Sequence, residues 1–207
     1  MTQIKERPIL FSAPMVRAIL EGRKTVTRRE VKKQAALDCL AAGFEPSFLT
    51  LPGNADLCPY GRAGDRLWVR ETWAADAQVD SIAPRDLSQG EPILYPADCA
   101  VRQTGCSMIT QGRGRPSIHM PRWASRILLE IADVRVERLQ DITYEQAVAE
   151  GVHRDRGCRV WTATDEDGTC HKYPIPAFKD LWTGINGPQA WESNPWVWVV
   201  EFKRVTP

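Results

Sequence analysis

The chain has 207 residues, with 27 basic and 26 acidic side chains and a formal net charge of +1. Hydrophobic residues make up 43% of it, which is typical of a folded globular protein and excludes the disordered and fibrous classes. Because the charges nearly cancel, any attraction to a polyanion must come from local clusters of cations. No apolar run approaches the roughly 20 residues of a membrane-spanning helix, so we expect no membrane partner.

The cysteines and the N-terminal region predict a cellular location. Six cysteines are spread along the chain without a C-x-x-C pair, which suits free thiols in a reducing compartment. The apolar run after Lys5 and Arg7 contains Pro8 and Pro14 and is interrupted by Arg17, unlike a secretory signal. We therefore expect a cytoplasmic protein.

The first elements are a short strand, a helix and a second strand. "PILFS" (8–12) has the pattern of a strand, and Ser12 can cap a helix with Pro14 in its first turn. Gly22 ends this helix by adopting the left-handed conformation. "KTVTRREV" (24–31) then predicts a strand in which Thr25, Thr27 and Arg29 share one face. Four cations therefore gather at a helix–strand junction in "EGRKTVTRRE".

The middle of the chain alternates between strands and long irregular segments. Residues 31–66 carry Gly and Pro breakers and predict a long connection before the strand "RLWVRETW" (66–73). Residues 74–117 form a second irregular region, interrupted by a short strand at "PILYP" (92–96). Long loops of this kind in a compact domain are usually functional or poorly ordered.

The last third contains the clearest signals. "SRILLEIADVRVERL" (125–139) predicts a long strand with a bend near Ala132 or Asp133. Thr143 and Gln146 form a capping box for a helix over 144–150, which Gly151 ends. A further helix is expected around 178–185, and a final strand over 196–205 has Trp196, Trp198, Val200 and Phe202 on one face.

The element order favours an α+β fold, namely a small mixed β-barrel with short helices at its ends. No repeat of 20 to 50 residues is present. We expect one domain over residues 1–207, with loop insertions near 31–66, 74–117 and 152–174.

Five motifs carry a resemblance to a known family: "PILFSAPMVRAILEGRKTVTRR", "GDRLWVRETW", "MPRWASRILLEI", "LQDITYEQAVAEGV" and "NPWVWVVEF". In this order, from about Pro8 to Phe202, they resemble the longer ASCH-domain proteins of phages and prophages. The resemblance implies a PUA-like β-barrel. The family includes proposed RNA-binding modules, ribonucleases and a small bacterial amidohydrolase that removes acyl groups from N4-acetylcytidine.

The resemblance to the small amidohydrolase implies three catalytic residues. Its "GRKT-x-T" stretch places a lysine at Lys24 and a threonine at Thr27. Its downstream glutamate falls most naturally on Glu150, with Glu145 as the alternative. This chain is about twice as long as the small enzyme, so the substrate does not follow from the motif.

The chemistry of these residues is consistent with amide hydrolysis, which needs a nucleophile, a base and donors for the developing oxyanion. Lys24 can act as a base only if burial and neighbouring cations lower its pKa. Arg23, Arg28 and Arg29 are the candidates for that neighbouring charge, and Arg29 on the Thr27 face can also stabilise the anionic intermediate. Glu150 would raise the pKa of Lys24, and can instead orient it or carry a proton to the leaving amine.

Two alternatives remain open for this stretch and its surroundings. A run of cations at a helix C-terminus can simply complement the helix dipole and face water. The second alternative is an RNA or single-stranded DNA binding module, with or without ribonuclease activity through Lys24 and His119. Its cations and aromatic residue would be Arg113, Arg115, Arg122, Arg126 and Trp123.

We expect substrate contacts from Arg23, Arg29, Arg70, Glu71, Trp73 and Trp123.

A third interpretation is a zinc site formed by His153, Cys158, Cys170 and His171. Their spacing fits no common zinc finger. We therefore expect neither a metal nor a cofactor. The expected partner is a modified nucleoside or a single-stranded nucleic acid, and the sequence does not determine the oligomeric state.

Overall fold

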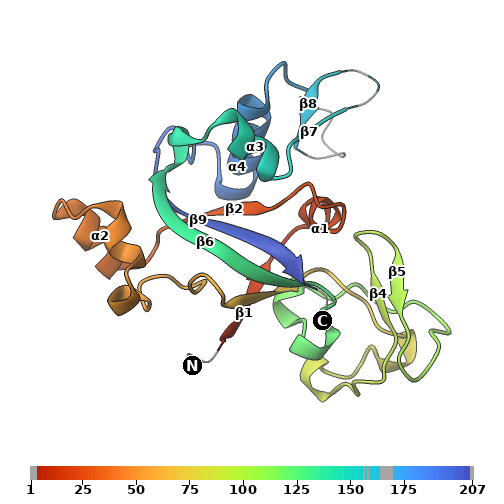
Figure 1. Cartoon of the computed structure of the whole chain (residues 1–207). Helices are drawn as coiled ribbons and strands as arrows, with labels where there is room; N and C mark the ends of the chain where they lie inside the picture. The colour runs from red at the N-terminus through yellow and green to blue at the C-terminus, as the bar shows by residue number, and fades with distance from the viewer. Residues whose placement is uncertain (1–3, 156, 158, 164–169, 206–207) are drawn as a thin grey trace.

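The architecture is a mixed α+β fold built on one five-stranded sheet. The computed structural model describes residues 4–155, 157, 159–163 and 170–205. The strand order is β1-β3-β6-β9-β2, with β1 parallel to β3 and the other neighbours antiparallel (Figure 1). The strands are β1 (Glu6–Leu10), β2 (Val26–Glu30), β3 (Arg66–Arg70), β6 (Leu128–Arg138) and β9 (Trp196–Val205).

The two long strands β6 and β9 form the spine of the sheet. Their pairing shifts register between Ile131 and Asp133, which confirms the predicted bend and lets the two strands curve together (Figure 1). Alternate β9 residues enter two different hydrophobic clusters, Trp198 and Val200 in one and Val197 and Val199 in the other. Both faces of the strand are therefore buried, as its nearly continuous apolar sequence requires.

Two of the three predicted helices begin and end close to the predicted positions. In α1 (Ala13–Leu20), Ser12 occupies the N-cap without a side-chain capping bond, and Gly22 is left-handed with φ of 75°. In α3 (Tyr144–Ala149) both bonds of the predicted capping box between Thr143 and Gln146 are present. The last helix, α4 (Pro174–Asn186), is longer than the predicted 178–185.

The three long connections contain secondary structure of their own. The first holds α2 (Gln34–Ala41), the second holds a hairpin of β4 (Ile93–Tyr95) and β5 (Ala100–Arg102), and the third holds β7 (His153–Arg154) paired with β8 (Trp161–Thr162). Seven 3-10 turns complete the described elements: Pro46–Thr50, Pro52–Asn54, Ala77–Val79, Pro84–Asp86, Ser117–His119, Arg122–Ala124 and Leu139–Asp141.

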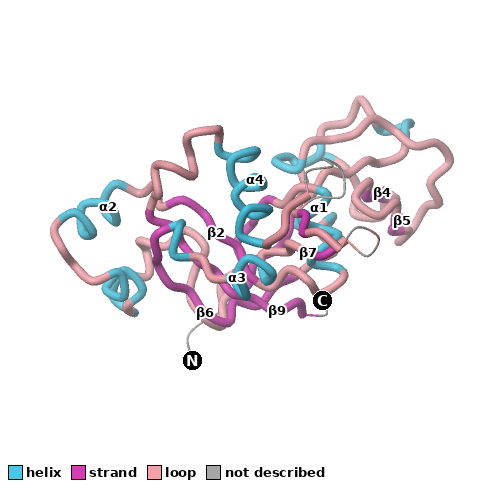
Figure 2. Tube along the Cα trace, turned by 90° about the horizontal axis from the view of Figure 1, so that it is seen from above, coloured by secondary structure: helices cyan, strands magenta, loops and turns pink. Residues whose placement is uncertain are grey.

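Three hydrophobic clusters stabilise the molecule. The first lies between the sheet, α1 and α2, the second lies on the other side of the sheet against α3 and α4, and the third fills the lobe around β4 and β5. Figures 1 and 2 show the α2 arm and the β4–β5 lobe projecting at opposite ends of the sheet. The insertions therefore extend the sheet domain in two directions.

The sheet is open in the described part of the chain. Strands β1 and β2 are its edges, and no strand pairing joins them among those residues. A side-chain bond spans the gap instead, because Arg29 Nη2 of β2 donates to the carbonyl oxygen of Leu10 in β1 at 2.6 Å. The predicted mixed α+β class is confirmed, whereas the predicted β-barrel is not.

Within residues 4–155, 157, 159–163 and 170–205, no helix combines the length and apolar character needed to cross a bilayer.

Candidate functional site

Lys24 lies just before β2 and is bonded to the end of α3. The backbone at Lys24 pairs with that of Glu150 in an isolated antiparallel bridge, and the Thr25 N–H donates to the Ala149 carbonyl at 2.8 Å. Gly151 makes this approach possible, since its φ is +103° and a Cβ there would lie 3.3 Å from the Lys24 Cβ. Two segments 126 positions apart are thereby held in contact.

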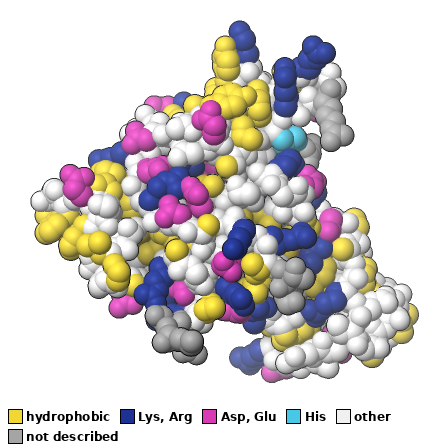
Figure 3. All heavy atoms as spheres, viewed as in Figure 1, with side chains coloured by type: hydrophobic (Ala, Val, Ile, Leu, Met, Phe, Trp, Pro, Cys, Tyr) yellow, Lys and Arg dark blue, Asp and Glu magenta, His cyan; other side chains and the backbone are white. Residues whose placement is uncertain are grey.

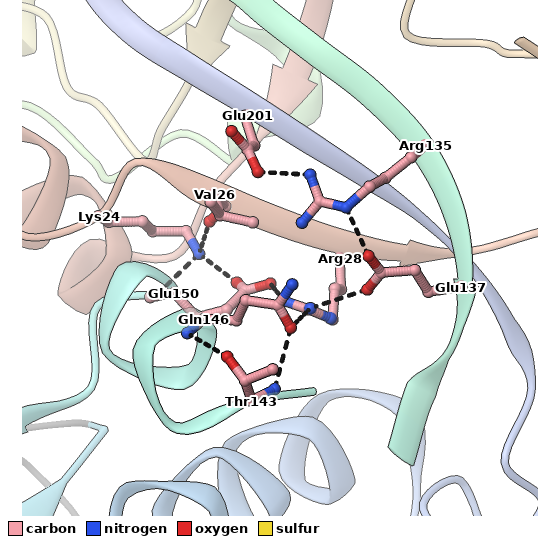
Figure 4. Close-up of polar contacts among 9 residues, drawn as sticks. All are labelled: Lys24, Val26, Arg28, Arg135, Glu137, Thr143, Gln146, Glu150 and Glu201. Carbon is pink, nitrogen blue, oxygen red and sulfur yellow. Dashed lines mark hydrogen bonds and ion pairs between the residues drawn. The ribbon is translucent and has the colours of Figure 1, made fainter. Parts of the chain in front are cut away.

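The Lys24 amine is completely enclosed. Its Nζ donates to the Val26 carbonyl at 2.8 Å, to the Glu150 carbonyl at 2.8 Å and to Glu150 Oε2 at 2.6 Å (Figure 4). The side chain has no exposed surface. Three acceptors match the three donors of an ammonium group, which allows Lys24 to form an ion pair with Glu150.

Burial nevertheless lowers the pKa of Lys24 below its usual value. Burial is the largest cause, the Glu150 carboxylate opposes it, and the charges of Arg29 and Arg28 add a smaller lowering. The sequence predicted both burial and neighbouring cations as causes of a lowered Lys24 pKa. It gave more weight to the guanidinium groups, whereas burial is the larger cause. The outcome is a buried ammonium that releases its proton more readily than an exposed lysine does.

Arg28 holds the other side of the Glu150 carboxylate. Its Nη1 donates to Glu150 Oε1 at 3.3 Å, and its Nη2 donates to Gln146 Oε1 at 2.8 Å and to Glu137 Oε2 at 3.2 Å. Glu137 in turn accepts a bond from Arg135, and Figure 4 shows this chain of charges converging between β2, β6 and α3. Because Gln146 also closes the capping box, the start of α3 and the Glu150 carboxylate are fixed by the same guanidinium.

A cavity of about 620 Å³ adjoins this cluster. It lies along β2, between α4 and the loop at 56–60. Its lining combines charged and aromatic side chains: Met15, Thr27, Arg28, Arg29, Glu30, Lys32, Lys33, Asp56, Leu57, Pro59, Tyr60, Glu150, Phe178, Leu181, Trp182, Ile185, Asn186 and Trp198. A volume of this size is typical of small-molecule sites.

Thr27 is the most informative residue of this lining. It is only 2% exposed, and its hydroxyl makes no hydrogen bond within the described part of the chain. Buried hydroxyl groups normally have a partner. Because the Thr27 hydroxyl lacks such a partner among the described residues, it can bond to a molecule in the cavity.

Arg29 supplies positive charge to the same cavity. No carboxylate among the described residues lies within 4.0 Å of its guanidinium, which lies over the Phe11 ring at 5.2 Å. Burial lowers its pKa, yet a guanidinium stays charged in proteins. Tyr60 also lines the cavity, and burial raises the pKa of its phenol while the charge of Arg29 opposes the rise.

The other predicted substrate contacts lie elsewhere in the fold. Arg23 bonds to Glu21 and to the Gly151 carbonyl, and Arg70 bonds to the Ile118 carbonyl. Glu71 is buried in a two-bond pair with Arg126, with both distances at 2.9 Å. None of the three lines the cavity.

The predicted aromatic contacts are also placed away from it. Trp73 has no exposed surface and belongs to the core of the β4–β5 lobe, so it cannot stack on a base. Trp123 packs against the same core, with Arg102 over its ring. The aromatic residues that do line the cavity are Tyr60, Phe178, Trp182 and Trp198, and the sequence pattern marked the last three only as packing residues.

The cations of the nucleic-acid interpretation are largely engaged inside the protein. Arg115 is buried and bonds to the carbonyls of Val79 and Ile82, and Arg126 bonds to Glu71 and Asp98. Arg122 pairs with Glu6, whereas Arg113 is exposed. On the face shown in Figure 3, basic and acidic side chains are intermixed over the middle of the molecule. Three of the four cations of this interpretation therefore already have partners within the protein.

The described residues do not support the predicted zinc site. Cys158 lies outside the described residues, and His171 Nε2 lies 2.6 Å from Asp180 Oδ2. Among the residues that the structure describes, no three His, Cys, Asp or Glu side chains are grouped as a metal site.

Comparison with protein-family models, with curated proteins and with solved structures gives no match to this chain.

Proposed function

We propose that the cavity hydrolyses an amide on an N-acylated cytidine-like base. The observation that carries the proposal is that Thr27, whose hydroxyl has no hydrogen-bond partner among the described residues, lines the same cavity as Glu150 of the Lys24–Glu150 pair. The resemblance of "GRKT-x-T" to the small N4-acetylcytidine amidohydrolase supports it. The same resemblance implies a PUA-like barrel fold for the domain that contains this sheet, and a modified nucleoside as the ligand.

The proposed reaction adds the Thr27 hydroxyl, or a water held by it, to the amide carbonyl carbon. The proton of that nucleophile passes to the Lys24–Glu150 pair through Glu150, which is the member of the pair that lines the cavity. The C–N bond then breaks, and the pair returns the proton to the leaving nitrogen. If Thr27 itself is acylated, a water hydrolyses the ester and releases the acid.

The remaining residues have supporting roles in this proposal. The guanidinium of Arg29 stabilises the negative charge that develops on the carbonyl oxygen. Lys24 is the proton donor of the pair rather than a free base, because its three hydrogen bonds leave no lone pair facing the cavity in the resting state. Tyr60, which is only half-buried, provides a flat surface for a base.

Deacylation of N4-acetylcytidine, followed by chromatography of released cytidine, tests the proposal. Thr27→Val should lower the rate about 100-fold or more. Since the hydroxyl has no protein partner, this change breaks no hydrogen bond within the described fold and should leave stability unchanged or slightly higher. The matched control is Thr25→Val, at an exposed position two residues away, which should keep full activity. Absence of cytidine release, or equal rates for Thr27→Val and wild type, would refute the hydrolase.

A further inference from the structure

The ligand cavity has more positive than negative charge in its lining. Arg28 and Glu150 satisfy each other, and Lys32 lies 3.7 Å from Glu30. Arg29 and Lys33 line the cavity without a carboxylate within 4.0 Å in the described part of the chain. The carboxylate of Asp56 is the remaining acid of the lining. Two cations therefore lack a contacting counter-ion where a ligand would bind.

The two unpaired cations occupy different places in the cavity. Arg29 is on β2 beside Thr27, whereas Lys33 follows the strand and is the N-cap residue of α2. The Lys33 amine donates to the backbone carbonyl of Asp56 at 2.6 Å, which fixes its position without neutralising its charge. The first turn of α2 contains no acidic residue and no side-chain capping bond, so its N–H groups add to the positive potential near Lys33.

The apolar wall is longer than a single base. Helix α4 contributes lining residues from Phe178 to Asn186, which at about 1.5 Å per residue is about 12 Å of helix. The Asn186 Nδ2 donates to the Trp182 carbonyl at 3.0 Å, which leaves its Oδ1 as an acceptor in the lining. A base can lie along this wall while a second group of the same ligand reaches the rim of the cavity.

We infer that the cavity takes a base that carries a phosphate, with the phosphate at Lys33. The inference rests on the proposed function for the identity of the reaction, and names the substrate as a nucleotide in place of a free nucleoside. Lysine is a common phosphate ligand and acts as a point charge on a flexible stem. The phosphate source is either a free 5′-mononucleotide or a nucleotide within a single strand.

The test compares three substrates: N4-acetylcytidine, its 5′-monophosphate and a short single-stranded oligonucleotide that contains N4-acetylcytidine. We expect kcat/KM to be about tenfold higher for a phosphorylated substrate, as for one charge-assisted hydrogen bond. Lys33→Gln should abolish this preference, so that the ratio of kcat/KM for the phosphorylated and the free substrate falls to about one. The control Lys203→Gln, at an exposed lysine paired with Glu130, should keep the preference.

The relative rates on the mononucleotide and the oligonucleotide identify the phosphate source. Equal kcat/KM for all three substrates, or a preference that survives Lys33→Gln, would overturn the inference while leaving the hydrolase intact.

A binding measurement separates this inference from the proposed reaction. Trp182 and Trp198 line the cavity, so their fluorescence reports ligand binding without turnover. Cytidine 5′-monophosphate should bind about tenfold more tightly than cytidine, and the difference should vanish in Lys33→Gln. If no acylated substrate is turned over, the hydrolase fails and this comparison alone decides: equal affinities, or no binding, would overturn the phosphate site.

Discussion

Replacing Lys24 with methionine tests whether the ion pair at the centre of the site is as enclosed as described. The change keeps an unbranched side chain of similar length but removes three hydrogen bonds and the charge that faces Glu150. Removing one partner of a buried pair costs about 3–5 kcal/mol of unfolding free energy. Because Arg28 still contacts the Glu150 carboxylate at 3.3 Å, we expect the lower end, about 3 kcal/mol.

Urea denaturation at neutral pH measures this cost, provided that wild type and variant have the same m-value. For a chain of this size, a loss of about 3 kcal/mol corresponds to a decrease in Tm of about 6–12 °C. Glu150→Gln should cost less, because the amide oxygen can still accept from Lys24. The loss of unfolding free energy in the double variant Lys24→Met/Glu150→Gln should be about 2 kcal/mol smaller than the sum of the two single losses.

The matched control is Lys32→Met, which removes a lysine amine whose side chain is 78% exposed. It should change the free energy of unfolding by about 0.5 kcal/mol or less. A loss below about 1 kcal/mol in Lys24→Met, or single effects that simply add in the double variant, would refute the enclosed pair.

Two further predictions concern the backbone and the pH dependence. Gly151→Ala should lower stability by about 1–3 kcal/mol in urea titrations, since its φ is +103° and a Cβ would meet Ala18 and Lys24; an unchanged midpoint would contradict the close approach. Hydrogen bonds from the N–H groups of Gln78, Ile109 and Thr110 hold the pKa of Asp76 below its usual value. A lowered native pKa stabilises the fold above the unfolded value near 3.8, and this contribution is lost as pH falls through the native pKa. Asp76→Asn should therefore be less stable at pH 7 and should approach wild type in acid; a gap that does not change with pH would contradict this.

Local patterns in the sequence determined much of the sheet and of α3. Strand alternation at 196–205 placed Trp198 and Val200 on one face, and the structure puts both in one cluster. The capping box at Thr143 and Gln146 is present because it depends on residues three apart. The helix α2 was missed, since the breakers around it dominated a segment of only eight helical residues.

The site was predicted less completely because its contacts are long-range. The assignment of Lys24 and Glu150 to the site rested on the resemblance, because no local sequence pattern relates two positions 126 apart. The role of Arg28 could not be read from strand alternation, since an arginine beside Thr27 normally indicates a solvent-facing side. Here α3 covers that side, and the guanidinium is fully enclosed by Glu150, Glu137 and Gln146. The contribution of Tyr60 depends on how the 31–66 connection folds back over β2.

The titration of the Lys24 side-chain amine, followed by nitrogen-detected NMR, tests the central claim most directly. The account predicts an Nζ resonance with slow hydrogen exchange and a pKa below the ordinary lysine value, and both features should disappear in Lys24→Met. The carboxylate resonance of Glu150 should respond in the same pH range, because the two groups share a 2.6 Å contact. A rapidly exchanging amine with an ordinary pKa, insensitive to Glu150→Gln, would contradict the account.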